Sequence, residues 1–162
     1  MEIKFLTAII SALVAVFIAV LNHFIVTPYK EAKERKRNRL KSLYAPLYGL
    51  INVRTYIIKE FIISKKKLML GGVDTAEYYS KEYMETFILE NSGYASNKLL
   101  NAWIEYVTQD IGDYEEERTK NLVITTVKEY NQLKKDLKYP YNQKELETGI
   151  PECIKEVRDF IN

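Results

Sequence analysis

The stretch 5–26, FLTAIISALVAVFIAVLNHFIV, constrains this chain more than any other feature. It contains no Asp, Glu, Lys or Arg. At a rise of about 1.5 Å per residue, a helix of this length crosses the roughly 30 Å hydrocarbon core of a bilayer. A cleaved signal peptide is the alternative, but the apolar run exceeds the usual core of about 7–15 residues and no Ala-x-Ala pattern follows it. We therefore predict a transmembrane helix.

Charge is distributed unevenly along the chain. Residues 1–67 contain 13 Lys and Arg against 4 Asp and Glu, whereas residues 68–162 contain 11 against 18. The positive-inside rule then predicts a single-pass protein of the cell membrane, with the N-terminus outside and the C-terminal domain in the cytoplasm. The acidic distal half argues against general nucleic-acid binding.

Basic residues gather directly after the predicted span. We predict that they bind the membrane surface, although a simple stop-transfer flank is the alternative. The residues are Lys30, Lys33, Arg35, Lys36, Arg37, Arg39 and Lys41.

Small residues recur every four positions within the span, at Ser11, Ala15 and Ala19, and Asn22 and His23 continue the same face of an α-helix. Small side chains at this spacing let two helices approach closely, and polar ones can hydrogen-bond across the contact. The pattern therefore predicts self-association through this face. The alternative is that alanines are ordinary in spans and that the two polar residues only mark the inner headgroups.

The rest of the chain has the period of amphipathic helices, and no segment alternates with the period of a strand. We predict an all-α fold, in which one N-terminal transmembrane helix precedes a cytosolic bundle of about four to five helices. The predicted organisation is a transmembrane anchor at 1–29, a basic juxtamembrane segment at 30–42 and a cytosolic helical domain at 43–162.

Capping residues and prolines predict where the helices begin and end. Thr27-Pro28 either caps a new helix or kinks the first one, and Pro46 bends the next helix or marks its start. The predicted starts are Asp74 with Glu77, Ser96, Asp113 with Glu116, Asn142 with Glu145, and Pro151; the predicted ends are Gly71-Gly72, Gly93, Gly112 and Gly149.

Helical spacing also predicts the core. We expect Trp103 to lie in the main core, since it shares a face with Leu99, Leu100 and Val107. The other predicted buried stripes are Tyr79, Tyr83 and Phe87; Leu40, Leu43, Tyr44, Leu47, Leu50, Ile51, Ile57, Ile58, Phe61 and Ile62; Leu122, Val123, Val127, Tyr130, Leu133 and Leu137; and Ile154, Val157 and Phe160.

Residues that carry catalytic chemistry are scarce. His23 and Cys153 are the only histidine and the only cysteine, which excludes an internal disulfide and the common His/Cys metal motifs. Gly71-Gly72 lacks the rest of a phosphate-binding loop, and Glu82 and Glu85 are typical of a solvated helix face. We predict no enzymatic activity, no cofactor and no metal.

Thirteen tyrosines favour a recognition surface, because tyrosine gives contact area at a small cost in entropy. The favoured function is a membrane-anchored helical interaction or scaffolding protein, with membrane lipid, a second copy of itself and an unidentified cytosolic protein as partners. The alternative is a membrane effector gated by a nucleotide-type signal, whose oligomeric spans perturb the membrane, as in phage-defence systems. Basic side chains converging in a pocket would favour the effector, and a continuous apolar or tyrosine-rich surface would favour the interaction protein.

Overall fold

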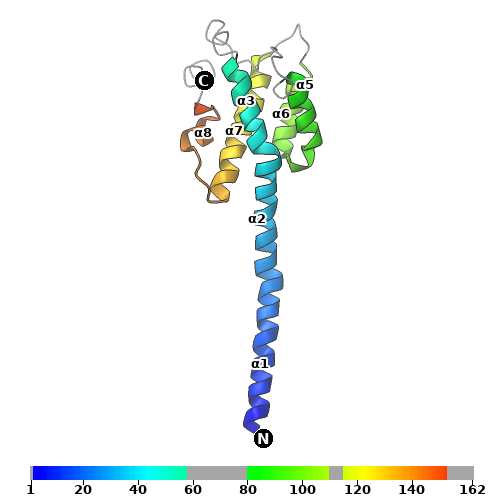
Figure 1. Cartoon of the computed structure of the whole chain (residues 1–162), viewed down its shortest axis with the longest axis vertical. Coiled ribbons are helices and arrows are strands. Elements are labelled where there is room, and N and C mark those ends of the chain that lie inside the picture. The colour runs from blue at the N-terminus through cyan, green and yellow to red at the C-terminus, as the bar shows by residue number, and fades with distance from the viewer. Residues whose placement is uncertain (1, 58–79, 110–114, 153–162) are drawn as a thin grey trace. The chain divides into compact units, whose positions relative to one another are not determined.

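The computed structural model describes residues 2–57, 80–109 and 115–152, and within these ranges the chain is helical with no strand. The predicted all-α fold class is thereby confirmed for the described part. The helical elements follow in this order (Figure 1): α1 Glu2–Leu21, η1 Asn22–Val26, α2 Thr27–Arg39, η2 Leu40–Tyr44, α3 Ala45–Ile57, α5 Lys81–Glu90, η4 Ser92–Tyr94, α6 Asn97–Val107, α7 Glu116–Asp136 and α8 Gln143–Thr148.

The chain divides into two compact units, Met1–Lys36 and Arg37–Asn162. The division falls inside the predicted juxtamembrane segment 30–42. The first unit contains α1, η1 and most of α2, and the second contains the helices that pack together as a bundle.

The helical run Phe5–Ile57, which begins in the first unit and continues into the second, is long and apolar enough to cross a membrane; among the described residues it is the one helix that meets this criterion. None of its apolar window is buried against other parts of the chain. Ile3, Leu13 and Phe17, for example, are all more than half exposed. The described residues therefore leave these side chains uncovered.

Two π-helical turns, η1 and η2, each end two residues before a proline. The Thr27 N–H donates to the carbonyl of Asn22, and the Ala45 N–H donates to the carbonyl of Leu40. Since proline lacks an N–H and its ring crowds the carbonyl four residues earlier, a locally wider turn lets the helix accommodate it. Of the two alternatives predicted at Thr27-Pro28, the cap of a new helix was wrong, because Thr27 is itself helical, at φ −64° and ψ −51°.

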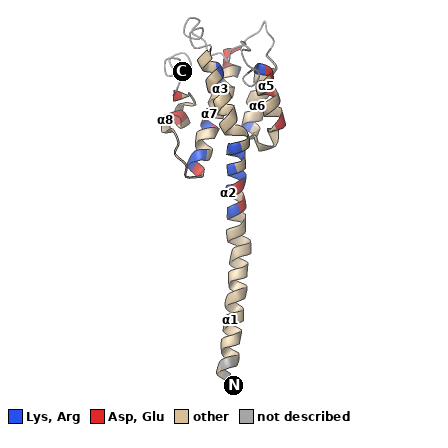
Figure 2. Ribbon diagram, viewed as in Figure 1, with Lys and Arg blue, Asp and Glu red and all other residues tan. Residues whose placement is uncertain are grey.

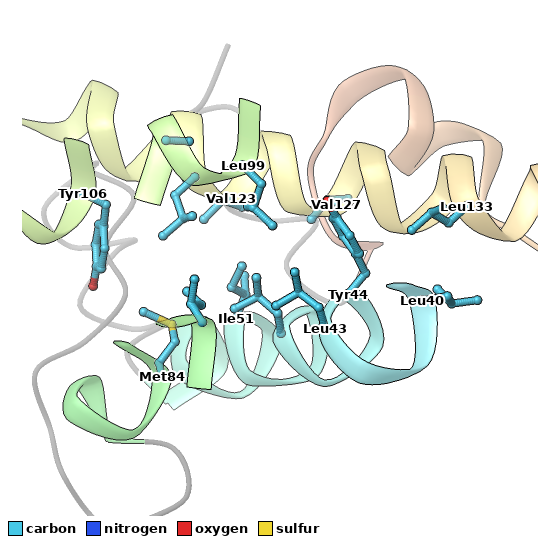
Figure 3. Close-up of a cluster of buried hydrophobic side chains, with 14 of the residues drawn as sticks. Leu40, Leu43, Tyr44, Ile51, Met84, Leu99, Tyr106, Val123, Val127 and Leu133 are labelled. Carbon is cyan, nitrogen blue, oxygen red and sulfur yellow. The ribbon is translucent and has the colours of Figure 1, made fainter. Parts of the chain in front are cut away.

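The second unit has one hydrophobic core (Figure 3). Helix α7 packs against α3, α6 and α8, and α3 also packs against α5. Figure 3 shows side chains from η2 and α3 facing those from α6 and α7, with Met84 of α5 at one end. The hydrophobic residues with no exposed surface are Leu43, Tyr44, Leu47, Ile51, Met84, Ile88, Leu99, Ala102, Leu122, Val123 and Val127. The predicted stripes on η2, α3 and α7 are largely confirmed by this burial; Leu50 and Tyr130 are half-buried and pack against the core, and Ile57 is 41% exposed.

Capping side chains start three of the helices. Ser96 accepts the N–H of Leu99, as predicted for the start of α6, and Ser80 accepts the N–H of Tyr83 at the start of α5. Asn142 accepts the N–H groups of Lys144 and Glu145 at the start of α8. Each cap satisfies donors that the first turn of a helix leaves without an intrahelical partner.

Helix α8 ends at Gly149, as predicted. This glycine has a φ of +76°, a left-handed conformation that side chains with a Cβ rarely adopt. A Cβ built there would lie 2.6 Å from Cγ2 of Ile124 and 2.9 Å from its Cα. The close approach of α8 to α7 therefore requires glycine at this position.

Three predicted packing details were wrong or only partly right. Tyr83 is 41% exposed, because α5 presents Met84 and Ile88 to the core and only Phe87 of the predicted stripe packs beside them. Trp103 packs against the core but is half-buried rather than central. Helix α6 ends at Val107, earlier than predicted.

Several predicted features lie outside the described residues. These are Gly71-Gly72, Asp74 with Glu77, Tyr79, Gly112, Asp113, Cys153, the stripe from Ile58 to Ile62, and the residues Ile154, Val157 and Phe160.

Candidate functional site

All the residues predicted for self-association of the span are exposed within the chain. Ser11 lies in α1, where its hydroxyl donates to the carbonyl of Thr7 at 2.9 Å. Asn22 and His23 lie in the wider turn η1, so the α-helical spacing that placed them on the Ser11 face ends at Leu21. The His23 ring meets Phe24 edge-on, with 5.0 Å between the ring centroids.

The predicted membrane-surface residues are divided between the two units. Lys30, Lys33, Arg35 and Lys36 belong to the first unit, and Arg37, Arg39 and Lys41 belong to the second. In Figure 2 the blue Lys and Arg positions of α2 follow a long stretch of ribbon that is coloured as uncharged. No residue of α2 is buried. Whether these side chains contact lipid stays a prediction.

Arg39 has partners inside the second unit. Its Nε donates to the carbonyl of Tyr94 at 2.9 Å, and its Nη2 donates to the Tyr44 hydroxyl at 3.1 Å. The Tyr44 hydroxyl in turn donates to Glu129, and the Ser96 hydroxyl donates to the same carboxylate at 2.7 Å. We call these five residues the Tyr44 cluster; it joins η2, α7 and the start of α6.

Burial raises the pKa of the Tyr44 phenol above its ordinary value, and the neighbouring Glu129 carboxylate raises it further by hydrogen bonding and by charge repulsion. The hydrogen bond from the Ser96 N–H acts in the opposite direction and is the smaller effect. Tyr44 therefore stays neutral at physiological pH, and its hydroxyl keeps its proton and donates a hydrogen bond to Glu129.

Glu145 is a buried carboxylate in α8, only 3% exposed. It accepts hydrogen bonds from the Tyr48 hydroxyl at 2.9 Å, from Nδ2 of Asn131 at 2.9 Å and from the N–H of Glu152 at 2.7 Å. The other side of the Asn131 amide accepts the N–H of Asn142 at 2.9 Å. This Glu145 cluster ties α3, α7 and α8 to the segment that follows α8.

A cavity of about 610 Å³ lies between α6 and α7. Its charged lining consists of three carboxylates and one guanidinium, and the guanidinium of Arg118 pairs with Glu115 at 2.7 Å. Glu105 accepts a hydrogen bond from Asn121 at 3.0 Å. The lining residues are Ile104, Glu105, Thr108, Glu115, Glu117, Arg118, Asn121 and Ile124. This excess of negative charge disfavours an anionic ligand.

Neither cluster has the composition of a catalytic or metal site. In the described ranges, no three His, Cys, Asp or Glu side chains come together closely enough to hold a metal ion. The acidic side chains of the two clusters are instead occupied by hydroxyl, amide and backbone donors, an arrangement that holds helices together.

Both clusters were missed by the sequence analysis. Glu129 lies at the edge of the apolar face of α7, where a carboxylate is a signal of a buried hydrogen bond. Glu145 was interpreted only as a capping residue. Comparison of the chain with protein-family models, with curated proteins and with solved structures finds no match.

Proposed function

We propose that this protein is a single-pass membrane protein whose helical unit acts as an interaction or scaffolding module. One observation carries the proposal: the chain contains a helix long enough to cross a bilayer, and none of its apolar window is buried by the residues that the structure describes. A core helix of a soluble protein would bury such side chains against its own fold. In a bilayer, lipid tails supply the missing apolar partner.

The proposed orientation has the helical unit in the cytoplasm. It follows from the basic residues after the apolar helix, which the positive-inside rule retains on the cytoplasmic side. The N-terminal flank, in contrast, contributes one basic residue, Lys4.

The proposed activity is docking, because the described part of the second unit offers exposed contact area and, within those residues, no arrangement typical of catalysis. Large apolar and aromatic side chains reach the surface of α3, α5, η4 and α6, and they include tyrosines of the kind that is enriched in recognition surfaces. The most exposed are Tyr56 at 64%, Leu89 at 60% and Ile104 at 50%. The effector alternative receives no comparable support, since the cavity between α6 and α7 is lined mainly by carboxylates.

Cysteine labelling in intact cells tests anchoring and orientation together. In a chain with Cys153 replaced by Ser, we expect Asn38→Cys to react with a membrane-impermeant maleimide only after the cells are permeabilised. The matched variant Ile3→Cys, at the other end of the apolar helix, should react in intact cells. The reverse pattern would overturn the orientation, and release of the protein from membranes by alkaline carbonate would overturn the anchor.

We also propose that two copies associate through the face that contains Ser11, Ala15 and Ala19. Ala15→Leu keeps the span apolar but adds bulk at its centre. We expect it to weaken the association free energy by about 1 kcal/mol, which should lower the crosslinking yield of the full chain in native membranes. Val14→Leu, about 100° away round the helix, is the control. Unchanged crosslinking in Ala15→Leu would reduce this face to a lipid-facing stripe.

A further inference from the structure

We propose that the connection between α7 and α8 binds an acidic segment of a protein partner; this inference rests on the proposed interaction function and adds a surface and a partner chemistry to it. The surface consists of Lys134, Lys135, Lys138, Tyr139 and Tyr141, which we call the basic tip. The first two residues lie in the last turn of α7, and the other three are exposed in the connection that follows it.

The backbone at the end of α7 holds a lysine in a conformation that normally belongs to glycine. Lys138 has a φ of +61°, and in the described ranges it is the one residue other than glycine with a positive φ. The Tyr139 N–H donates to the carbonyl of Lys134 at 2.8 Å, and the Lys138 N–H donates to the carbonyl of Lys135 at 3.0 Å. This pair of hydrogen bonds ends many helices, usually with glycine at the left-handed position. Glycine would adopt this φ without the steric cost that lysine carries.

The rest of the connection is also held in place. Pro140 has a fixed φ, and beyond it the Asn142 N–H donates to the side-chain oxygen of Asn131 at 2.9 Å. The ammonium of Lys135 lies over the ring of Tyr141, 5.8 Å from its centroid. Side chains that are ordered before binding lose less conformational entropy when a partner docks.

Stabilisation of a helix end explains only part of the basic tip. Lys134 and Lys135 lie in the last turn of α7, where positive charge is favourable beside the helix dipole. That effect does not account for lysine instead of glycine at position 138. It does not account either for two tyrosines at the surface, Tyr139 at 40% and Tyr141 at 37% exposed. Exposed tyrosines beside charge are typical of recognition surfaces.

Charge identifies the partner. Residues 134–141 contain three lysines and one acidic residue, Asp136, which accepts a hydrogen bond from Nε2 of Gln132 at 2.7 Å. No carboxylate of the described residues pairs with the three lysines. The basic tip therefore favours an anionic partner.

The size of that partner follows from the charge around the tip. The rest of residues 68–162 contains 8 Lys and Arg against 17 Asp and Glu. An extended anion, such as nucleic acid or a bilayer surface, would also meet this negative charge. A short acidic segment of a protein meets only the tip, since the Debye length at physiological ionic strength is about 8 Å.

The first test measures binding of a labelled peptide to the full chain in detergent by fluorescence anisotropy. The probe is a run of glutamates flanked by glycines, and the same peptide with glutamines is its control. We expect the glutamate peptide to bind more tightly, with a preference that falls as salt is raised. Lys138→Gln should weaken its binding about two- to fivefold, the effect of one exposed ion pair. Lys98→Gln, at an exposed lysine of α6, should not, and equal weakening by both variants would overturn the basic tip.

Lys138→Gly separates binding from folding. Glycine relieves the left-handed strain and removes the charge, so the urea midpoint of unfolding should stay the same or rise while the affinity for the glutamate peptide falls. A lower midpoint, or an unchanged affinity, would contradict the argument that lysine is held there for binding.

Photo-crosslinking in native membranes tests the nature of the partner. With p-benzoylphenylalanine in place of Tyr139, we expect a crosslink to a protein segment that mass spectrometry shows to be rich in Asp and Glu. The crosslink should be lost when Lys135→Gln and Lys138→Gln are added. Tyr94, which is also 40% exposed, is the matched position and should not give the same crosslink. A crosslink to lipid or nucleic acid, or one that the lysine changes do not affect, would overturn the proposal.

The same crosslinker at Leu89, among the exposed side chains on which docking was proposed, distinguishes the two proposals. Protein crosslinks from Leu89 with none from position 139 would overturn the basic tip alone. Absence of protein crosslinks from both positions would contradict the interaction function as well.

Discussion

The two units of the molecule differ in how much of their apolar side-chain surface is buried. The bundle of the second unit covers its apolar side chains with its own helices, so that Leu43, Leu99 and Val127 have no exposed surface. The apolar helix of the first unit leaves Leu13 at 64% exposed and Phe17 at 63%. The difference teaches that apolar content alone does not define a core: the second unit buries its apolar side chains among its own helices, whereas no described residue buries the apolar window of the first.

The largest expected effect comes from separating the two regions. A chain that begins at Arg37 should remain in aqueous solution, give a far-ultraviolet circular dichroism spectrum dominated by helix and unfold in one cooperative transition. The full chain should need detergent or lipid. A strand-dominated spectrum would contradict the fold class, and aggregation of the shorter chain would show that the bundle also depends on the membrane segment.

Matched leucine substitutions test the comparison residue by residue. Leu43→Ala should lower the free energy of unfolding of the bundle by about 2–5 kcal/mol, because it leaves a cavity in a fully packed site. Leu13→Ala removes the same atoms from an exposed position of α1 and should leave unfolding of the bundle unchanged. Denaturant unfolding of both variants in the same detergent gives the two values. Equal losses would mean that α1 packs against protein after all.

Buried carboxylates give the next largest effect. Glu145→Ala should destabilise the bundle by about 2–3 kcal/mol, because three donors lose an acceptor that water cannot readily replace. Glu147, two residues further on and exposed, accepts a hydrogen bond from the side chain of Gln143, and Glu147→Ala should cost no more than about 0.5 kcal/mol. Urea unfolding of both variants gives their losses in free energy of unfolding. Similar losses would contradict a specific role for the Glu145 cluster.

The smallest expected effect depends on pH. Tyr44→Phe should lower the free energy of unfolding by about 1–2 kcal/mol at pH 8, because it removes a hydrogen bond to a carboxylate. Since folding raises the pKa of Tyr44, its contribution is fully present below the ordinary tyrosine value of about 10 and is lost as pH rises through the folded-state pKa.

Urea titrations over a pH series measure the difference in the free energy of unfolding between wild type and Tyr44→Phe. We expect this difference to shrink as pH rises above about 10. Ionisation of the other tyrosines affects both proteins and cancels in the difference. Tyr94→Phe, at a tyrosine that is 40% exposed, should show no such narrowing. A gap that stays constant to high pH would contradict the role of the Tyr44 proton.

Local signals in the sequence were sufficient for much of the fold. Ser96, Asn142 and Gly149 act within one helical turn of themselves, so their residue types predicted the start of α6 and both ends of α8. The buried face of α7 followed from its period. The prolines left two alternatives open at each position, because their effect depends on whether the preceding turn can widen, and neither η1 nor η2 has a sequence signature as strong as a cap.

The two polar clusters could not be predicted from local signals, because their partners are distant in sequence. Tyr48 and Glu145 lie 97 residues apart, and Tyr44 and Glu129 lie 85 apart. Asn142 and Glu145 have the spacing of a capping box, in which the glutamate returns to the N–H of the cap. Here the N–H of Asn142 donates to Asn131 instead, and Glu145 is released to bind donors from other helices.

The contact between Gly149 and Ile124 has a consequence for how this sequence can diverge. Every amino-acid substitution of a glycine introduces a Cβ, and at position 149 that atom would meet the Cα of Ile124 at 2.9 Å as well as its side chain. A smaller residue at position 124 would relieve only the side-chain part of the collision, because the Cα of residue 124 stays in place. Descendants that keep this junction of α7 and α8 should therefore keep the glycine.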